Sequence, residues 1–424
     1  MLKITCEGVY YKNGGFVPAK DGPAAGLPAP EKAREGTMAH AILKAHNTGD
    51  NMEELAIRFD AMASHDITYV GIIQTARASG MQAFPLPYVL TNCHNSLCAV
   101  GGTINEDDHV FGLSAAKKYG GEFVPAHQSV IHSYMRERYA APGRMILGSD
   151  SHTRYGAYGT MAIGEGGPEL ARQLLSKTYN IPYPKVIAIY LTGTPIPGVG
   201  PQDVALELIR STFKDGVVKN AVMEFFGPGV ANLSMDYRSG IDVMTTETTC
   251  LSSIWPADHT LKAHLAVLGR GEAFKPQAPA DGAYYDGLIE VELDKIRPMI
   301  ALPFHPSNAY TIQEFQENLD ELLHQVDEDT VRQLKLKNRP ASLREKIVDG
   351  KFRVDQGVIA GCSGGTYQNI VRAAQILDGR AIGSGEFWLS VYPTSQPVNL
   401  ELTRKGYITS LMAAGASIRS CFCG

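Results

Sequence analysis

Apolar runs that stop at glycine-rich or polar segments recur along the chain and predict an α/β fold. Short, largely apolar or alternating runs are typical of strands, and they occur at residues 145–150 (MILGSD), 185–191 (KVIAIYL), 287–297 and 357–361. Residues 84–95 form an extended apolar run that ends in a loop. Apolar residues at helical spacing predict helices over residues 37–46, 52–63, 127–139, 168–179, 202–213, 312–336 and within 361–377.

Two proline-rich segments divide this pattern into three parts. They are residues 192–201 (TGTPIPGVGP) and 298–308 (PMIALPFHPSN). In the first part, the strand at 145–150 is followed by a glycine-rich turn and a helix, a βα pattern that places ligands at the carboxyl end of a sheet. The predicted α/β domains cover residues 1–192, 193–303 and 304–424.

The composition is that of a folded protein with a large core. Of 424 residues, 44% are hydrophobic and 20% are charged, and the formal net charge is −5 without a dense run of Lys or Arg. Seven cysteines are spread along the chain, which fits a reducing compartment. The first residues lack the form of a signal peptide, and no apolar run reaches about 18 residues. We therefore expect a cytoplasmic protein with no membrane span and no nucleic-acid partner.

The first candidate for chemistry is the segment GSDSHTRYGAYGTMAIGEGG (148–167). If the strand continues through it, Asp150 and His152 share one face and Ser151 lies on the other, so the three cannot form a catalytic relay among themselves. Asp150 is instead predicted to orient a histidine from another segment, with His132 as the candidate. The alternative is that these groups only satisfy the backbone of a loop. The glycines that follow allow close approach of the backbone to a ligand.

The second candidate is a set of cysteines on glycine-rich loops. Cys362 ends a strand-like run, and Cys421 and Cys423 lie at the end of the sequence. Thiolates on such loops are typical iron–sulfur ligands, although the spacing matches no standard zinc or ferredoxin pattern. Each cysteine, taken singly, is also compatible with a place in the core.

The third candidate is Glu247, which lies between threonines in an otherwise apolar stretch (241–259). A carboxylate is costly to bury unless it is paired or binds a ligand. The sequence leaves two interpretations open, a paired carboxylate in a site and a half-exposed glutamate in a loop.

Taken together, these segments resemble the aconitase superfamily, the iron–sulfur hydro-lyases that include aconitase, homoaconitase and isopropylmalate dehydratase. The blocks follow the family's order from about residue 37 to the last residue: VIHSYMRERYAAPG (130–143), the DSH segment (148–167), VVKNAVMEFFGPGV (217–230), ETTCLSSIWP (247–256) and GCSGGTYQNIVRAA (361–374). The resemblance implies three α/β domains of the aconitase iron–sulfur type around a central cleft, with the swivel domain absent.

The resemblance also implies a [4Fe–4S] cluster at the junction of the domains. Cys362 corresponds to the first cluster ligand, and Cys423 to the first cysteine of the family's second ligand pair. The third cysteine ligand is expected beyond Gly424. The 424 residues are therefore expected to belong to a longer chain, or to pair with a swivel domain on a separate subunit, and to be inactive when isolated.

Further roles implied by the resemblance concern acid–base chemistry and substrate contact. His132 and Asp150 correspond to an acid–base or orienting pair, Ser151 to a substrate-binding residue, and Glu247 to a group at the open iron. The catalytic set implied in this way is His94, His132, Asp150, His152 and Glu247.

Several positions depart from the family's pattern. Cys93 stands where an aspartate pairs with the histidine that corresponds to His94, Val70 stands in place of a glutamine beside the substrate, and Val243 in place of an asparagine near the cluster. The usual SCTN loop reads GCSGG here. These departures argue against plain citrate as the substrate and leave the hydroxy acid open.

The function implied by the resemblance is the reversible dehydration of a small hydroxycarboxylic acid. An iron without a protein ligand would act as a Lewis acid, with a base for the proton next to a carboxylate and an acid for the leaving hydroxyl. Two alternatives remain open. One is a degenerate homologue with a binding or regulatory role, such as RNA binding or iron sensing, and the other is a cluster-free lyase that resembles the aconitase X branch.

Overall fold

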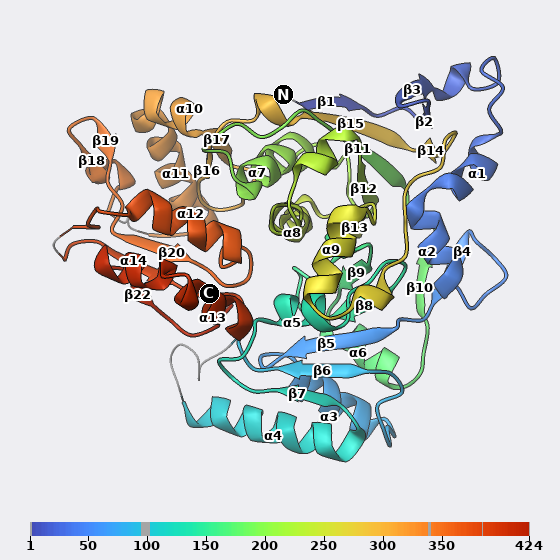
Figure 1. Cartoon of the computed structure of the whole chain (residues 1–424), viewed down its shortest axis with the longest axis horizontal. Coiled ribbons are helices and arrows are strands. Elements are labelled where there is room, and N and C mark those ends of the chain that lie inside the picture. The colour runs from blue at the N-terminus through green and yellow to red at the C-terminus, as the bar shows by residue number, and fades with distance from the viewer. Residues whose placement is uncertain (1, 95–101, 338–340, 384, 424) are drawn as a thin grey trace.

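The computed structural model describes residues 2–94, 102–337, 341–383 and 385–423. These residues form an α/β structure with two five-stranded sheets, two three-stranded sheets, several two-stranded ones and helices packed around them (Figure 1). The predicted α/β fold class is therefore confirmed. Among the described residues, every helix is too short or too polar to serve as a membrane span.

The first sheet is entirely parallel and has the strand order β7-β6-β5-β8-β9. Its strands are β5 (Ala61–His65), β6 (Tyr88–Thr91), β7 (Glu122–Val124), β8 (Met145–Gly148) and β9 (Met161–Gly164). Its helices are α3 (Tyr69–Ala78), α4 (Thr103–Tyr119), α5 (Ile131–Arg138) and α6 (Gly167–Leu174). The chain proceeds from β5 towards β7 on one side and from β8 towards β9 on the other. The strand order thus reverses between β5 and β8, and such a point opens a crevice at the carboxyl ends of the strands.

The second sheet has the order β1-β15-β11-β12-β13, with β1 antiparallel to its neighbour and the other pairs parallel. Its strands are β1 (Leu2–Thr5), β11 (Val186–Thr192), β12 (Val222–Phe226), β13 (Ser252–Ile254) and β15 (Gly287–Glu292). The helices nearby are α2 (Met38–His46), α7 (Pro201–Thr212), α8 (Met235–Met244) and α9 (His259–Val267), with a 3-10 helix at Thr245–Thr248. Strand β11, which precedes the expected boundary at residue 192, pairs with β12 and β15, which follow it.

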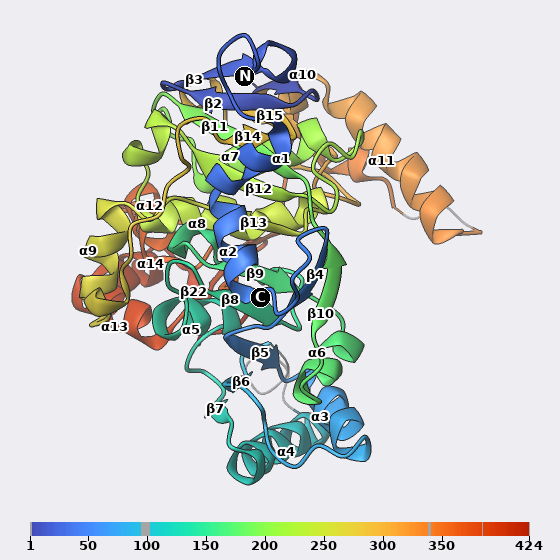
Figure 2. The same cartoon turned by 90° about the vertical axis from the view of Figure 1, so that its right-hand side faces the viewer.

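The two large sheets share their hydrophobic cores. The Ser252 hydroxyl on β13 donates a hydrogen bond to the Ala162 carbonyl on β9 over 2.7 Å. One apolar core contains Ile146 and Phe225, and a second contains Met62 and Val222, so each core draws on both sheets. Figure 2 shows the strands following one another along the molecule from β15 to β7.

The third sheet is parallel, with the order β20-β21-β22. Its elements are β20 (Gln356–Ile359), β21 (Trp388–Val391), β22 (Ser417–Ile418), α12 (Tyr367–Leu377), α13 (Gln396–Arg404) and α14 (Tyr407–Ala413). The segment that leads to it contains β16 (Met299–Ala301), β17 (Ala309–Thr311), α10 (Ile312–Glu317), α11 (Leu319–Leu334), β18 (Ile347–Val348) and β19 (Lys351–Phe352). The smaller remaining elements are β2 (Val9–Lys12), β3 (Gly15–Pro18), α1 (Pro30–Ala33), β4 (Glu54–Ile57), β10 (Tyr179–Pro182) and β14 (Tyr284–Tyr285).

The predicted helix over residues 52–63 is wrong, because this segment forms β4 and the start of β5. Leu55, Ile57 and Phe59 are buried while the residues between them are more exposed, which is the two-residue period of a strand. The same apolar residues also fit part of one face of a helix, so the pattern is ambiguous, but the strand assignment is the correct one.

The other predicted elements are present with shifted ends. Helix α6 stops at Leu174, five residues before the predicted end, and β15 stops at Glu292 rather than at residue 297. The predicted helix over 312–336 is divided at Asn318 into α10 and α11. The last residue of the predicted segment 84–95 lies outside the described residues.

Candidate functional site

Three neighbouring strand ends of the first sheet place polar side chains together. His65 is the last residue of β5, His94 follows β6, and Asp150 follows β8. The reversal of strand order between β5 and β8 leaves these ends facing one crevice, because the crossover helices on the two sides turn away from each other. The fold therefore creates a site at the place where parallel α/β sheets commonly bind ligands.

The DSH segment is a tight turn and not the continuation of a strand. Strand β8 ends at Gly148, and an Asp150 carboxylate oxygen accepts a hydrogen bond from the His152 backbone N–H over 2.7 Å. The strand-alternation argument for residues 150–152 is thus wrong, because the turn brings Asp150 and His152 into direct contact. The Ser151 hydroxyl is exposed and lies 3.3 Å from Nδ1 of His152. A Cβ at Gly164 would collide with the carbonyl oxygen of Asp150, so this glycine supports the turn itself.

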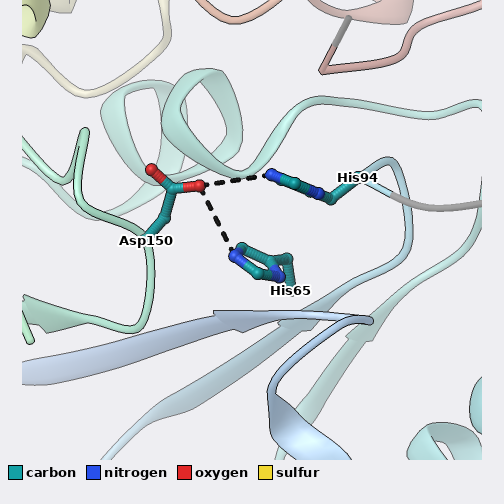
Figure 3. A group of neighbouring side chains, drawn as sticks. All are labelled: His65, His94 and Asp150. Carbon is teal, nitrogen blue, oxygen red and sulfur yellow. Dashed lines mark ion pairs between the residues drawn. The ribbon is translucent and has the colours of Figure 1, made fainter. Parts of the chain in front are cut away.

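The Asp150 carboxylate lies at the centre of four imidazoles. Its Oδ1 is 3.2 Å from Nε2 of His132 on α5 and 3.6 Å from Nδ1 of His152. Its Oδ2 is 3.4 Å from Nε2 of His65 and 3.5 Å from Nε2 of His94 (Figure 3). The structure thus places His132 and His94, both named from the sequence, against the same carboxylate, together with a histidine that the sequence analysis did not single out.

Burial and charge give these groups different protonation states. The histidines around Asp150 outweigh its burial and hold the pKa of its carboxyl far below the usual range. Burial lowers the pKa of His132 to about 4, in spite of Asp150. Burial also opposes protonation of His152, but hydrogen bonds to Asp150 and Glu247 raise its pKa to about 9. At neutral pH the site therefore holds an ionised Asp150, a neutral His132 and a protonated His152.

Glu247 is a paired carboxylate with a side chain that is 23% exposed. It belongs to the 3-10 helix at residues 245–248. The Thr246 hydroxyl of this helix donates a hydrogen bond to the Ser151 carbonyl over 2.6 Å and so connects the helix to the DSH turn. Glu247 Oε1 lies 3.1 Å from Nε2 of His152, and this hydrogen bond lowers the pKa of Glu247. Its Oε2 lies 3.7 Å from Nε2 of His305. Of the two interpretations left open by the sequence, the paired one describes the structure.

The two predicted cluster cysteines lie on adjoining loops at the carboxyl end of the third sheet. Cys362 follows β20 and Cys423 follows β22. The Cys362 N–H donates to the Cys423 carbonyl over 3.1 Å, and a hydrogen bond between the two thiols lowers the pKa of Cys362 to about 6. A Cβ at Gly361 would collide with the Phe422 carbonyl oxygen, so a glycine is needed for the loops to touch. Two converging thiols on glycine-rich loops fit a pair of iron–sulfur ligands.

The third sheet lies against the first at the site. The Val130 N–H donates to the Thr394 carbonyl over 3.0 Å, and the Gln396 N–H donates to the Gln128 carbonyl over 2.9 Å. The Cys423 N–H donates to the Cys93 carbonyl over 2.8 Å, one residue from His94. The thiols therefore adjoin the group around Asp150, and the site is assembled where the carboxyl ends of two parallel sheets meet.

Two histidines of the site were missed by the sequence analysis. His65 ends the run AMASH (61–65), of which the first three residues fell in the predicted helix over 52–63, and a strand assignment would have put His65 at a strand end beside Asp66. His305 lies in the proline-rich segment that was taken only as a boundary, and its ring stacks on Phe213 with 3.9 Å between the ring centres. The sequence offered no signal that His305 would reach Glu247.

The fold and the site define an α/β protein with a buried acid–base group beside two convergent thiols. The chain belongs to the aconitase family: the model of that family, described as aconitate hydratase, matches residues 40–424. This confirms the resemblance identified from the sequence.

Named relatives show the same relationship over part of their length. The mitochondrial aconitate hydratase of Schizosaccharomyces pombe is 30% identical over 391 residues, which cover 87% of this chain and 46% of the relative. Its counterpart in Saccharomyces cerevisiae is 27% identical over 420 residues, 92% of this chain and 50% of the relative. A probable mitochondrial aconitate hydratase of Dictyostelium discoideum is 27% identical over 415 residues, which also cover 92% of this chain and 50% of the relative. The chain spans about half the length of the curated relatives it matches.

Proposed function

We propose that this chain bears the acid–base and cluster-binding residues of a hydro-lyase that reversibly dehydrates a small hydroxycarboxylic acid. The observation that supports the proposal most directly is the meeting of two sets of groups: a protonated His152 between two carboxylates, and the thiols of Cys362 and Cys423 on the loops beside it. Membership of the aconitase family supports the same reaction class.

The thiols of Cys362 and Cys423 would hold a [4Fe–4S] cluster. When bound, such a cluster supplies a Lewis-acidic iron for the carboxylate and hydroxyl of the substrate. Cys362 is suited to this role because its lowered pKa of about 6 favours the thiolate, the form that binds metal.

His152 is proposed as the acid for the departing hydroxyl. Because its pKa of about 9 keeps it protonated at neutral pH, it donates a proton to the hydroxyl, which leaves as water when the carbon–oxygen bond breaks. The carbon–carbon double bond forms from the electrons of the neighbouring carbon–hydrogen bond, whose proton goes to a base that the proposed swivel domain would supply. In the hydration direction the neutral imidazole takes a proton from water. Asp150 holds His152 by a hydrogen bond to its backbone N–H, and Glu247 fixes the opposite edge of the ring. The neutral His132, the exposed Ser151 and His94 are proposed to orient Asp150 and the substrate.

The test uses the natural full-length protein isolated without oxygen. We expect about four iron and four sulfide ions per chain, and the formation of an unsaturated carboxylate, detected by its ultraviolet absorbance, from at least one of a panel of hydroxy acids. Cys362→Ala should lose iron and turnover, whereas Cys6→Ser, at an exposed free cysteine, should lose neither. His152→Asn should keep the iron and lower turnover by about 10²- to 10⁴-fold.

Each result to the contrary would contradict a particular part of the proposal. Full iron content in Cys362→Ala would remove that residue from the cluster, and wild-type turnover in His152→Asn would remove it from the acid role. Turnover without iron or sulfide would favour the cluster-free alternative. Salt-dependent RNA binding by an inactive protein would favour a regulatory role.

Three further expectations stay predictions. A swivel domain, in the same chain or on a separate subunit, is proposed to complete the cleft, and turnover by the isolated 424 residues would contradict this. A cytoplasmic location is proposed from the cysteine content. Cell fractionation would distinguish it from a mitochondrial location, which the names of the relatives include. The substrate is proposed to differ from plain citrate because Val70 and Cys93 depart from the family's pattern.

A further inference from the structure

His65, His94 and Asp150 form one group, in which the proposed hydro-lyase function uses His94 and Asp150 but gives no role to His65. Oδ2 of Asp150 and one ring nitrogen of each histidine all lie within 4.8 Å of one another. Figure 3 shows both rings directing Nε2 towards the same carboxylate oxygen. We propose that these three groups bind a single divalent transition-metal ion of the zinc, iron(II) or cobalt(II) class, at a site separate from the thiols.

The separations between the carboxylate oxygen and the two imidazole nitrogens are also those of two ligands of one ion. The distances from Oδ2 to the two Nε2 atoms are 3.4 and 3.5 Å. A charge-assisted hydrogen bond between nitrogen and a carboxylate is shorter, about 2.7–2.9 Å. Two ligands of a tetrahedral ion with bonds of about 2.05 Å are separated by about 3.3–3.4 Å, which agrees with the observed distances.

The carboxylate is already oriented for such an ion. Oδ1 of Asp150 accepts the His152 backbone N–H over 2.7 Å and faces His132, which leaves Oδ2 directed at the two other histidines. Hydrogen bonds of this kind to a ligating carboxylate commonly fix the orientation of metal ligands. The histidine rings are stacked, with 4.1 Å between centres and 22° between planes, so they present their nitrogens side by side.

The ligand types select the class of ion. Two imidazoles and a carboxylate suit zinc, iron and similar metals, whereas magnesium and calcium prefer oxygen ligands. A set of three protein ligands leaves a fourth position open for water or a substrate oxygen. The side chains of Asp150 and His65 are only 8% and 6% exposed, so an ion held by them would be shielded from water.

The structure also limits the expected affinity. Nδ1 of His65 and Nδ1 of His94 are buried and, among the described residues, have no hydrogen-bond partner. Metal-binding histidines usually donate this second N–H to a carboxylate or carbonyl, and loss of such partners typically weakens binding about 10- to 100-fold. We therefore expect binding that is stoichiometric but reversible by chelators.

Cobalt(II) titration of the full chain carrying Cys362→Ser and freed of iron by chelation tests the site without competition from the paired thiols. We expect one Co²⁺ per chain, with visible ligand-field absorption and without a thiolate-to-cobalt charge-transfer band. His65→Phe keeps an aromatic ring to stack on His94 and removes a ligand, so the affinity should fall by at least about 10-fold. In the same background, His324→Phe, the same change at an exposed histidine of α11, should leave the affinity unchanged.

The control for folding is the circular dichroism spectrum of each variant, and His65→Gln is the second variant should His65→Phe fail to fold. Unchanged affinity in a folded His65 variant would overturn the proposal, as would the absence of saturable binding. Loss of binding in Cys362→Ser would assign the ion to the thiols instead. The readout needs neither sulfide nor turnover, so failure of the iron–sulfur hydro-lyase proposal and failure of this one are distinguishable.

Discussion

Glu224 on β12 offers a direct test of how burial and hydrogen bonding compete in this fold. Its side chain is fully buried, and it accepts hydrogen bonds from the backbone N–H groups of Met38 (3.1 Å) and Ala39 (2.9 Å) and from the Tyr285 hydroxyl (2.7 Å). The two N–H groups belong to the first turn of α2, so Glu224 connects this helix to the sheet. Burial opposes ionisation more strongly than these donors favour it, and the pKa of Glu224 is raised from 4.5 to about 7.

The raised pKa makes the free energy of unfolding depend on pH in a defined direction. Below pH 4.5 the carboxyl is protonated in both the folded and the unfolded chain, and it contributes no pH dependence. Between pH 4.5 and 7 the unfolded chain ionises while the folded chain retains the proton, so the contribution of Glu224 falls as pH rises. A pKa shift from 4.5 to about 7 corresponds to about 3 kcal/mol across this window.

Urea unfolding of the wild type and Glu224→Gln at several pH values between 4.5 and 7.5 measures this contribution. The glutamine cannot ionise, so the difference in stability between wild type and variant should shift by about 3 kcal/mol in favour of the variant as pH rises. Loss of one acceptor adds a constant cost of about 1–2 kcal/mol to the variant at every pH. Glu321→Gln, at an exposed carboxyl on α11, is the control for removal of a charge.

A flat difference between wild type and Glu224→Gln would refute this reasoning. A difference that moved in favour of the wild type with rising pH would show that the three donors and the positive end of α2 outweigh burial. The first result would mean that Glu224 adds nothing to the pH dependence, and the second that its contribution has the opposite sign. The constant cost of the substitution does not affect either conclusion, because it does not change the slope of stability against pH.

Further predictions concern a buried ion pair and two glycines. Arg238→Met should lower the free energy of unfolding, measured with urea, by about 3–5 kcal/mol, because Arg238 is fully buried and holds both oxygens of Asp258 at 2.9 and 2.6 Å. The double variant with Asp258→Asn should recover part of this loss. Gly361→Ala should lower stability by about 1–3 kcal/mol and reduce iron retention, because its Cβ would meet the Phe422 carbonyl. Gly71→Ala, at an exposed helical position with open space, should raise the melting temperature by the equivalent of about 0.5–1 kcal/mol, and a loss there would contradict the helix-propensity argument.

Much of the fold was predictable because local patterns have local causes. Buried runs such as 185–191 form strands because a parallel sheet covered on both faces needs apolar residues at every position. The segment 52–63 was assigned to the wrong element because a short apolar pattern fits both a strand and part of a helix. Only pairing with a neighbouring strand, as between β5 and β8, decides between the two.

The sequence by itself determined which residues have the chemistry of the site. Asp150, His152, Glu247 and the cysteines stand in recognisable segments, because the glycines and short motifs around them are local requirements of tight turns. Only the tertiary structure decided which of these groups meet. The reversal of strand order between β5 and β8 places His65 beside Asp150, although 85 positions separate them in the sequence. Contacts between strand ends depend on sheet order, and sheet order leaves no local signal in the residues that it joins.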